Sequence, residues 1–219
     1  CIAENRGVNL GVGSELETTT NDEQLLSRTD GEGAPSWSDE DLFKQPPPRD
    51  ECPICMLTLP LDEQETNYQA CCGKVLCSGC IDAVEVQDYQ IPCPFCRTPA
   101  HASDGEYIGR LKERAANDAE AIYNLGYYYR HGERGLRQDQ DKAMELYLRA
   151  GELGYAGAYH NIGYAYDNGE YVEENMKKAK YYWELSAMMG HVNARYDLGA
   201  LEEEAGNMDR AVKHWMISA

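Results

Sequence analysis

The chain has 219 residues, of which 20 are Lys or Arg and 38 are Asp or Glu, so its formal net charge at pH 7 is −18. This acidic balance opposes binding to a phosphate backbone, where affinity comes from cationic contacts, and no nucleic-acid partner is expected. No apolar run approaches the ~20 residues that span a bilayer, so no membrane partner is expected either. Nine cysteines without a visible signal peptide favour a reducing compartment, cytoplasmic or nuclear.

Residues 1–49 form an acidic tail rich in Gly, Ser, Thr, Asp and Glu, ending in the three prolines Pro46–Pro48. Such a composition buries too little apolar surface to offset the entropy of ordering, so the tail is expected to be disordered. Its segment Trp37–Phe43 flanks acidic residues with bulky apolar ones, and is either a solvated linker or a short partner-binding motif. Since the first residue is Cys1 rather than Met, the chain reads as a fragment, with Cys1 as a surface thiol.

Eight cysteines lie between residues 50 and 100, in four pairs: Cys52 and Cys55, Cys71 and Cys72, Cys77 and Cys80, Cys93 and Cys96. A C-x2-C turn directs two thiolates at one tetrahedral ion, so the pairs predict two Zn²⁺ ions with four ligands each. A disulfide framework is the alternative, which the spacing and the odd cysteine count disfavour. Because the segment is poor in apolar residues, zinc binding, typically worth ~10–16 kcal/mol, is expected to supply its folding energy.

The order of these motifs, with C-C-G-K-x-x-C-x2-C in the middle and C-P-x-C-R at the end, resembles the RING finger, the zinc module of many ubiquitin ligases. The resemblance implies a small cross-brace domain over residues 50–100, with a short central helix over residues 81–89. It also implies that the pairs interleave, with one ion held by Cys52, Cys55, Cys77 and Cys80 and the other by Cys71, Cys72, Cys93 and Cys96.

The module departs from the usual RING pattern at Lys74, which stands where that family has a histidine and which offers zinc no lone pair at neutral pH. In an all-cysteine variant, the adjacent Cys71 and Cys72 reach one ion only if the backbone turns, and Gly73 makes such a turn cheap. The alternative is that one of the two is a buried free thiol and that a nearby group such as His101 completes the site.

The resemblance implies an activity in which this chain supplies no nucleophile. A RING ligase binds a ubiquitin-conjugating enzyme that carries ubiquitin as a thioester, and orients the pair for attack by a substrate lysine. Ile54 and Pro94 match the apolar docking contacts of that family, and Arg97 matches its linchpin cation, which bonds to both the conjugating enzyme and ubiquitin. In a non-catalytic scaffold, the same residues would be turn filler and a surface charge. A histone-tail or lipid reader is a more distant alternative, since only Lys74 and Arg97 are cationic between residues 51 and 100.

Residues 104–117 are predicted to form a linker helix, because Ile108, Leu111 and Ala115 share one helical face. Beyond it, the motif at Ala121–Gly126 recurs at Ala158–Gly163 and at Ala194–Gly199. Each copy is followed by a glycine-bearing loop and a second segment with its own helical register. The distance between successive copies of the motif, from Gly126 to Gly163 and from Gly163 to Gly199, is the period of the repeat. A period of this length predicts a solenoid of helical hairpins, in which each hairpin buries its apolar face on the next.

This pattern, with Ala-x3-Leu-Gly on the first helix and Lys-Ala on the second, resembles the Sel-one-like repeat (SLR), a relative of the tetratricopeptide repeat. The resemblance covers residues 118–219, in units at 118–154, 155–190 and a truncated 191–219, beyond which a cap or further repeats are expected. The glycines that end the motif are expected to permit close approach of a neighbouring helix. Recurring tyrosines are predicted to pack in the core, namely Tyr129, Tyr147, Tyr166 and Tyr182, and others to form a recognition surface, namely Tyr127, Tyr128, Tyr164 and Tyr181.

The predicted fold class is therefore a small zinc-stabilised module followed by an all-α helical solenoid, behind a disordered tail. The predicted function is that of a RING-type ubiquitin-protein ligase, whose repeats bind a substrate or partner protein. The alternative is a protein-protein interaction scaffold with a purely structural zinc finger.

Overall fold

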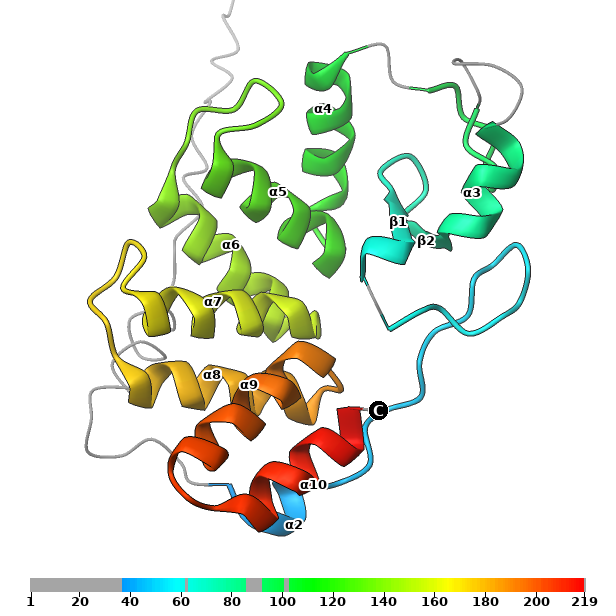
Figure 1. The fold of residues 1–219 in the computed structure, drawn as a ribbon. Coiled ribbons are helices and arrows are strands. Elements are labelled where there is room, and N and C mark those ends of the chain that lie inside the picture. Colours follow the sequence, from blue (N-terminus) through cyan, green and yellow to red (C-terminus); the bar gives the residue numbers. More distant parts are fainter. Residues whose placement is uncertain (1–36, 62, 86–91, 101–102, 219) are drawn as a thin grey trace, which may run out of the picture. The chain divides into compact units, whose positions relative to one another are not determined.

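The computed structural model describes residues 37–61, 63–85, 92–100 and 103–218. The described part begins with the short helix α2 (Asp39–Leu42). The cysteine-rich module follows, with the 3-10 turn η1 (Glu63–Glu65), strands β1 (Thr66–Gln69) and β2 (Lys74–Cys77), and helix α3 (Ser78–Glu85) (Figure 1). Seven further helices complete it: α4 (Asp104–Arg114), α5 (Ala119–His131), α6 (Gln140–Glu152), α7 (Ala156–Asn168), α8 (Met176–Met188), α9 (Val192–Glu204) and α10 (Met208–Ser218). Among the described residues, no helix has the length and apolar character needed to cross a membrane.

The cysteine-rich module is built on a two-stranded sheet with a very small core. Strands β1 and β2 pair antiparallel, with Thr66 opposite Cys77 and Gln69 opposite Lys74. Apart from two cysteines, the buried hydrophobic residues described between positions 50 and 100 are Ala70 and Leu76. Two such side chains cannot offset the entropy of ordering a module of this size, so its fold needs another source of stability.

Helix α3 begins at Ser78, three residues before the start predicted at residue 81, because it follows directly on strand β2. The predicted end at residue 89 lies outside the described residues. Helix α4 likewise ends at Arg114 rather than at Asn117. Its buried residues are Ile108 and Leu111, which lie on the face that the apolar spacing predicts.

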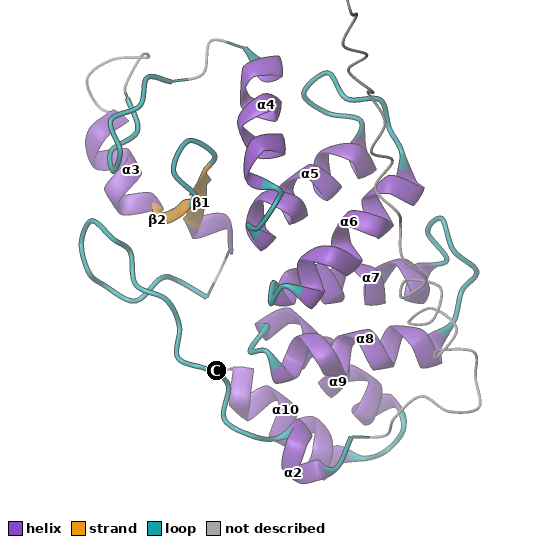
Figure 2. Cartoon of the chain, turned by 180° about the vertical axis from the view of Figure 1, so that it is seen from behind, coloured by secondary structure: helices purple, strands orange, loops and turns teal. Residues whose placement is uncertain are grey.

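Helices α4 to α10 form a solenoid in which each helix packs on the next one in the chain (Figures 1 and 2). Side-chain oxygens start the helices at Asp118, Asp139 and Asn175, each accepting a hydrogen bond from a backbone N–H in the first turn. Left-handed glycines end the first helix in two hairpins, at Gly132 and Gly169. The helical solenoid that the repeat pattern predicts is therefore confirmed.

The recurring glycines lie against aromatic rings of the second helix in their own hairpin. A Cβ atom built on Gly126 would lie 2.9 Å from a ring carbon of Tyr147, and one on Gly163 would meet Trp183 closer still. Gly199 stands in the same way against Trp215. Close helix approach is thus the reason for these glycines, as predicted.

Most of the tyrosines predicted to pack are in the core: Tyr147, Tyr166 and Tyr182 are buried, while Tyr129 is half-buried. Of those predicted to form a recognition surface, Tyr127 and Tyr164 are exposed. The remaining two, Tyr128 and Tyr181, are half-buried, and each has an edge-on ring contact with another tyrosine. Part of the predicted set is therefore exposed, and so is Tyr196 of α9, which was not predicted and is 64% exposed.

The segment at residues 37–49 differs from the prediction of a tail disordered up to residue 49. Ser38 caps helix α2, and Leu42 is buried with 1% of its surface exposed. Its partners lie on helices near the far end of the chain, which is why local composition does not predict this order. The preceding residues, including Cys1, lie outside the described ranges.

Candidate metal centre

Two knuckles of the same shape carry four of the eight cysteines. In Cys52–Leu57 the N–H of Met56 donates to the carbonyl of Cys52, and the N–H of Cys52 to the carbonyl of Leu57. In Cys93–Thr98 the N–H of Arg97 donates to the carbonyl of Cys93 in the same pattern. Met56 and Arg97 both have a positive φ, 60° and 59°. Each C-P-x-C motif therefore folds into a tight loop with its two thiols on one side.

The structure gathers the eight sulfurs into two groups of four, within which the sulfur atoms all lie within 4.8 Å of one another. One group contains Cys52, Cys55, Cys77 and Cys80, and the other contains Cys71, Cys72, Cys93 and Cys96. These groups have the same members as the two ligand sets that the RING resemblance implies. Cysteines from separate parts of the chain thus converge at two points.

The spacing within each group fits a tetrahedral metal ion. The Sγ atoms of Cys55 and Cys77 are 3.8 Å apart, and those of Cys72 and Cys93 are 3.9 Å apart. Four sulfurs bound to zinc at ~2.3 Å would lie ~3.8 Å from one another. A disulfide requires ~2.05 Å, and all eight cysteines are free. The two groups can bind metal ions, and the disulfide alternative has no support in the described residues.

The ionisation of the thiols also favours a cation at these points. Burial opposes ionisation of Cys52, but hydrogen bonds from backbone N–H groups outweigh it and lower the pKa to about 6. In the other group, burial and the neighbouring Cys93 raise the pKa of Cys72 to about 11. Clustered thiols thus resist ionising together, and a divalent cation removes that repulsion.

The adjacent cysteines Cys71 and Cys72 reach the same group because the backbone turns there. The N–H groups of Cys72 and Gly73 both donate to the carbonyl of Gln69, and Gly73 has a φ of 67°. Arg114 of helix α4 holds this turn from outside, since its Nε and Nη2 donate to the carbonyls of Ala70 and Cys71, each at 2.8 Å. The alternative ligand His101 lies outside the described residues.

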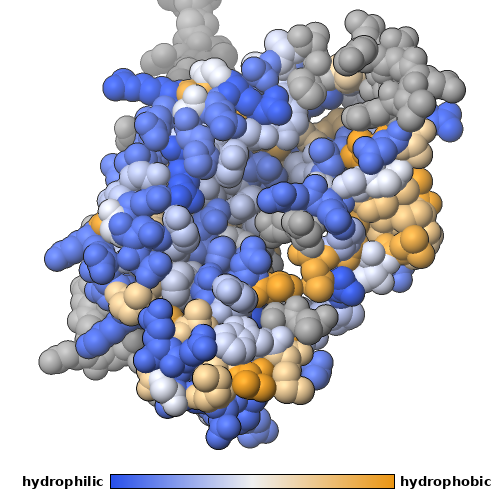
Figure 3. Space-filling view, in the orientation of Figure 1, coloured by the Kyte–Doolittle hydropathy of each residue, from blue (hydrophilic) through white to orange (hydrophobic). Residues whose placement is uncertain are grey.

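The residues predicted to contact a conjugating enzyme are accessible. Ile54 is 41% exposed, Pro94 is half-buried and Arg97 is exposed, each next to a cysteine of a knuckle. Further apolar side chains of the module are also exposed, which the sequence analysis missed: Met56, Leu57, Leu61 and Phe95. The signal was present, since Phe95 occupies the position in C-P-F-C that Ile54 occupies in C-P-I-C. In Figure 3 apolar surface gathers on the right-hand side, over the loops of this module.

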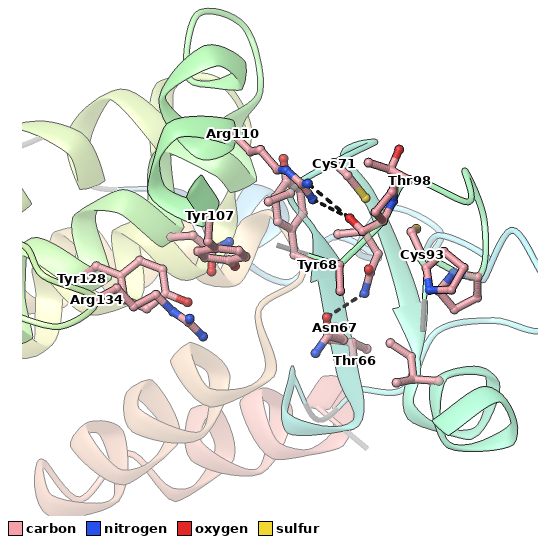
Figure 4. A pocket seen from close by; sticks show the side chains of 18 residues that line it. Thr66, Asn67, Tyr68, Cys71, Cys93, Thr98, Tyr107, Arg110, Tyr128 and Arg134 are labelled. Atoms are coloured by element: carbon pink, nitrogen blue, oxygen red, sulfur yellow. Dashed lines mark hydrogen bonds between the residues drawn. The ribbon is translucent and has the colours of Figure 1, made fainter. Parts of the chain in front are cut away.

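A cavity of about 440 Å³ lies between the cysteine-rich module and the first helices of the solenoid (Figure 4). Tyr68 and Cys71 line it on one side, and Tyr107, Tyr128 and Arg134 on the other. The guanidinium of Arg134 lies over the ring of Tyr107, 4.4 Å from its centroid. The cavity is polar and lies beside the second cysteine group.

Comparison with known proteins identifies the class of the helical part. Residues 119–155 and 156–191 match the model of the Sel1 repeat. Helices α5 to α8 therefore form two Sel1 repeats. Among solved structures, a Sel1 repeat protein from Oxalobacter formigenes is similar with a TM-score of 0.49 and 27% identity, covering 52% of this chain and 48% of that one. The protein c5321 of uropathogenic Escherichia coli is similar with a TM-score of 0.47 and 31% identity, covering 51% and 25%.

Several relatives are named as ubiquitin ligases or as a component of one. The chain is 30% identical over 95 residues to the E3 ubiquitin-protein ligase GW2 of Oryza sativa subsp. indica, covering 42% of this chain and 21% of that protein. It is 30% identical over 95 residues to the ERAD-associated E3 ubiquitin-protein ligase component HRD3B of Arabidopsis thaliana, covering 43% and 15%. For the E3 ubiquitin-protein ligase DA2 of Arabidopsis thaliana the identity is 27% over 98 residues, covering 44% and 23%. The chain thus spans less than a quarter of these relatives.

Proposed function

We propose that this chain is a RING-type ubiquitin-protein ligase. The observation that carries the proposal is the interleaved convergence of eight cysteines from four places in the chain on two points. In the proposal, each group of four holds one Zn²⁺ ion, and the ions supply the folding energy that Ala70 and Leu76 cannot. The metal is structural, so the module acts through what its surface binds.

That surface is proposed to recruit a ubiquitin-conjugating enzyme. Ile54 and Pro94 offer apolar contacts, and Arg97 offers a planar cation with five N–H donors. The positive φ of Arg97 and the hydrogen bond from its N–H to Cys93 fix where its side chain leaves the knuckle. An arginine placed in this way can bond to two proteins at once, and so hold thioester-linked ubiquitin in the orientation that a substrate lysine attacks.

The names of the relatives support a role in ubiquitin transfer, and the Sel1 repeats support protein binding. In the proposal, the solenoid binds the substrate or partner while the zinc module binds the conjugating enzyme. The second candidate is a scaffold without catalysis. It is favoured by one relative that is named as a component of a ligase and by the large share of the chain given to repeats.

Arg97→Ala is the variant that tests the proposal. With a panel of conjugating enzymes, the variant is expected to form ubiquitin chains at least tenfold more slowly than the wild type while it retains two zinc ions. Lys74→Ala is the matched control, since it removes an exposed cation of the same module at a position without a linchpin role. Its rate is expected to stay within twofold of the wild type.

Gel-based assays of autoubiquitination, with metal analysis of the same samples, give both readouts. An equal rate for Arg97→Ala and wild type would remove the linchpin role. If the zinc-loaded wild type forms no chains with any conjugating enzyme, the scaffold is the better description.

A further inference from the structure

The last two helices of the solenoid, with α8 beside them, form a surface that residues 38–43 occupy, and Arg210 there pairs both with Asp39 of the segment and with Glu202 of α9. We call this surface the third-repeat groove, and its side chains are Arg195 of α9 with Arg210, Lys213 and His214 of α10. Helix α2 lies beside α10 in both ribbon views and contacts α8 (Figures 1 and 2). A segment from near one end of the sequence is thus bound to helices from the other.

Leucine and phenylalanine make the apolar part of this contact. Leu42 is buried, and its carbonyl accepts a hydrogen bond of 2.6 Å from Nη1 of Arg195. The ring of Phe43 lies 4.7 Å from that of His214, measured between centroids. Leu42 is removed from water completely and Phe43 in part, so these two side chains are the apolar anchors of the segment.

Charge complements the apolar anchors. Asp39 forms ion pairs with Arg210 and with Lys213, the latter at 3.8 Å. The cationic groups of Arg210 and Lys213 also lie 5.4 Å and 5.3 Å from the centroid of the Phe43 ring, within the range of a cation–π contact. The same two cations, Arg210 and Lys213, therefore contact a carboxylate and, four residues later in the segment, an aromatic ring.

Residues 38–43 leave some buried polar atoms of the groove without a hydrogen-bond partner. Nε and Nη2 of Arg195, and Nε2 of His214, are buried and have no hydrogen-bond partner among the described residues. Burying donors of a guanidinium without partners is costly, so the hydrogen-bonding capacity of the groove exceeds what residues 38–43 supply. A ligand that offers more acceptors near Arg195 would bind better than the segment now in place.

We propose that the third-repeat groove is a peptide-recognition site, and that residues 38–43 are a ligand in cis which an acidic-hydrophobic segment of a partner protein replaces. The partner segment carries a carboxylate, followed three and four residues later by leucine and an aromatic residue, as Asp39, Leu42 and Phe43 do. The inference rests on the part of the proposed function that assigns partner binding to the repeats. It requires no ubiquitin transfer, so the two can fail separately.

Fluorescence anisotropy with a labelled peptide of residues 36–47 tests the proposal on the full chain. The variant Leu42→Ala/Phe43→Ala, which weakens the cis ligand, is expected to bind the peptide at least tenfold more tightly than the wild-type chain. The reason is that a tethered ligand competes at millimolar effective concentration. A peptide with alanine at the Leu and Phe positions is expected to bind neither chain.

The groove itself is tested in the same variant. Adding Arg210→Ala and Lys213→Ala is expected to weaken peptide binding at least tenfold, whereas the charge-matched control Lys112→Ala/Lys177→Ala leaves it within twofold. The proposal would be overturned if the two double substitutions weakened binding equally. It would also be overturned if the peptide did not bind to the Leu42→Ala/Phe43→Ala chain. A wild-type chain that dimerises through Leu42 would overturn it as well, because the occupant would then be a second copy.

Circular dichroism shows whether the Leu42→Ala/Phe43→Ala chain is folded. If it is not, Asp39→Lys replaces it, because that side chain is about half exposed and its loss spares the apolar contacts. The folded Asp39→Lys chain is expected to bind the wild-type peptide at least threefold more tightly than the wild-type chain does. The absence of any gain would also overturn the proposal.

Discussion

Two buried side chains that can carry charge lie side by side on α9 and α10. Arg195 is 1% exposed and His214 is fully buried. Burial lowers the pKa of His214 to about 4, and the positive charges of Arg195, Arg210 and, more weakly, Lys180 act in the same direction against the opposing carboxylate of Glu202. His214 is therefore neutral at pH 7, where its ring packs against Phe43.

This histidine is expected to make the stability of the last helical hairpin, α9 and α10, depend on pH. The pKa of His214 in the fold, about 4, lies below its ordinary value of 6.5, so the unfolded chain takes up a proton first as pH falls. Stability is then full above pH 6.5 and is lost between pH 6.5 and pH 4. Between pH 7 and pH 5 the loss is expected to be about 2 kcal/mol, measured by urea unfolding.

The control is His214→Gln, which removes the titration and keeps a polar side chain of similar size. Carboxylates also titrate near pH 5, so the informative quantity is the difference between the two pH profiles. The variant is expected to be less stable than the wild type at pH 7 and to change less between pH 7 and pH 5. Parallel profiles would show that His214 is not the group responsible.

At this scale, spacing alone singled out the cysteines, whereas Arg97 and Ile54 were singled out only because the motif order resembles a known family. No sequence pattern pointed to a role for Arg195 or His214. Arg195 acquires its role from the carbonyl of Leu42, 153 positions away in the chain, and no local pattern contains that information. The pairing of His160 with Asp197 across 37 positions, at 2.8 Å, was missed for the same reason.

Among the helices, a glycine facing an aromatic ring sets the distance within each hairpin. Gly126, Gly163 and Gly199 recur on the first helices, and Tyr147, Trp183 and Trp215 recur on the second. Glycine in a helix costs up to ~1 kcal/mol relative to alanine, so each hairpin accepts that cost to bring the ring onto the backbone. The contact between glycine and ring therefore fixes how the two helices of each hairpin align.

Gly163→Ala is expected to destabilise the chain, although alanine is the better helix former. A methyl group there would overlap the indole ring of Trp183, and overpacking typically costs 1–3 kcal/mol, more than the propensity gains. Thermal unfolding is expected to show a melting temperature lower by about 2–8 °C.

Gly109→Ala in helix α4 is the matched control, because nothing lies within 4 Å of a Cβ atom at that position. It is expected to leave stability unchanged or to raise it by up to ~1 kcal/mol. If Gly163→Ala raised the melting temperature as much as the control does, the close contact would have no energetic weight.

The helices of the solenoid were predictable because their apolar residues repeat at helical spacing, and their buried faces follow that spacing. The start of α3 and the end of α4 were less so, since α3 follows directly on strand β2 and α4 ends at Arg114 rather than at Asn117. Helix α2 was assigned to a disordered tail because four residues of acidic composition cannot fold alone. Its order comes from the groove that receives it.

At the scale of the whole molecule, a hydrogen-bonded cluster joins the cysteine-rich module to the first repeat. The hydroxyl of Tyr68 in β1 donates to Oδ2 of Asp118 at 2.6 Å, while Oδ1 of Asp118 accepts from the N–H of Ala121 and so caps helix α5. Arg114 belongs to the same cluster: its Nη1 lies 3.8 Å from Oδ2 of Asp118, and its Nη2 donates to the carbonyl of Cys71. The carboxylate of Asp118 thus accepts hydrogen bonds from both the cysteine-rich module and the solenoid.

If the two cysteine groups hold zinc as proposed, its removal is expected to unfold the module and to weaken the solenoid slightly. With excess chelator, the amides of β1 and β2 should lose protection from hydrogen exchange, because the core formed by Ala70 and Leu76 cannot hold the strands. Most helical signal should remain, since helices α4 to α10 contain no cysteine. The melting temperature of the repeats is expected to fall by about 2–4 °C, the effect of losing ~1 kcal/mol of hydrogen bonding at Asp118.

Arg114→Ala separates this coupling from metal loss. Without the guanidinium, the turn at Cys71 loses two hydrogen bonds from helix α4, so zinc should be released to a chelator faster than from the wild type. Lys112→Ala on an exposed face of the same helix should leave the release rate unchanged. The second cysteine group would then owe part of its metal affinity to the solenoid. Equal release rates in both variants, with melting of the repeats indifferent to chelator, would mean that the module and the repeats are energetically independent.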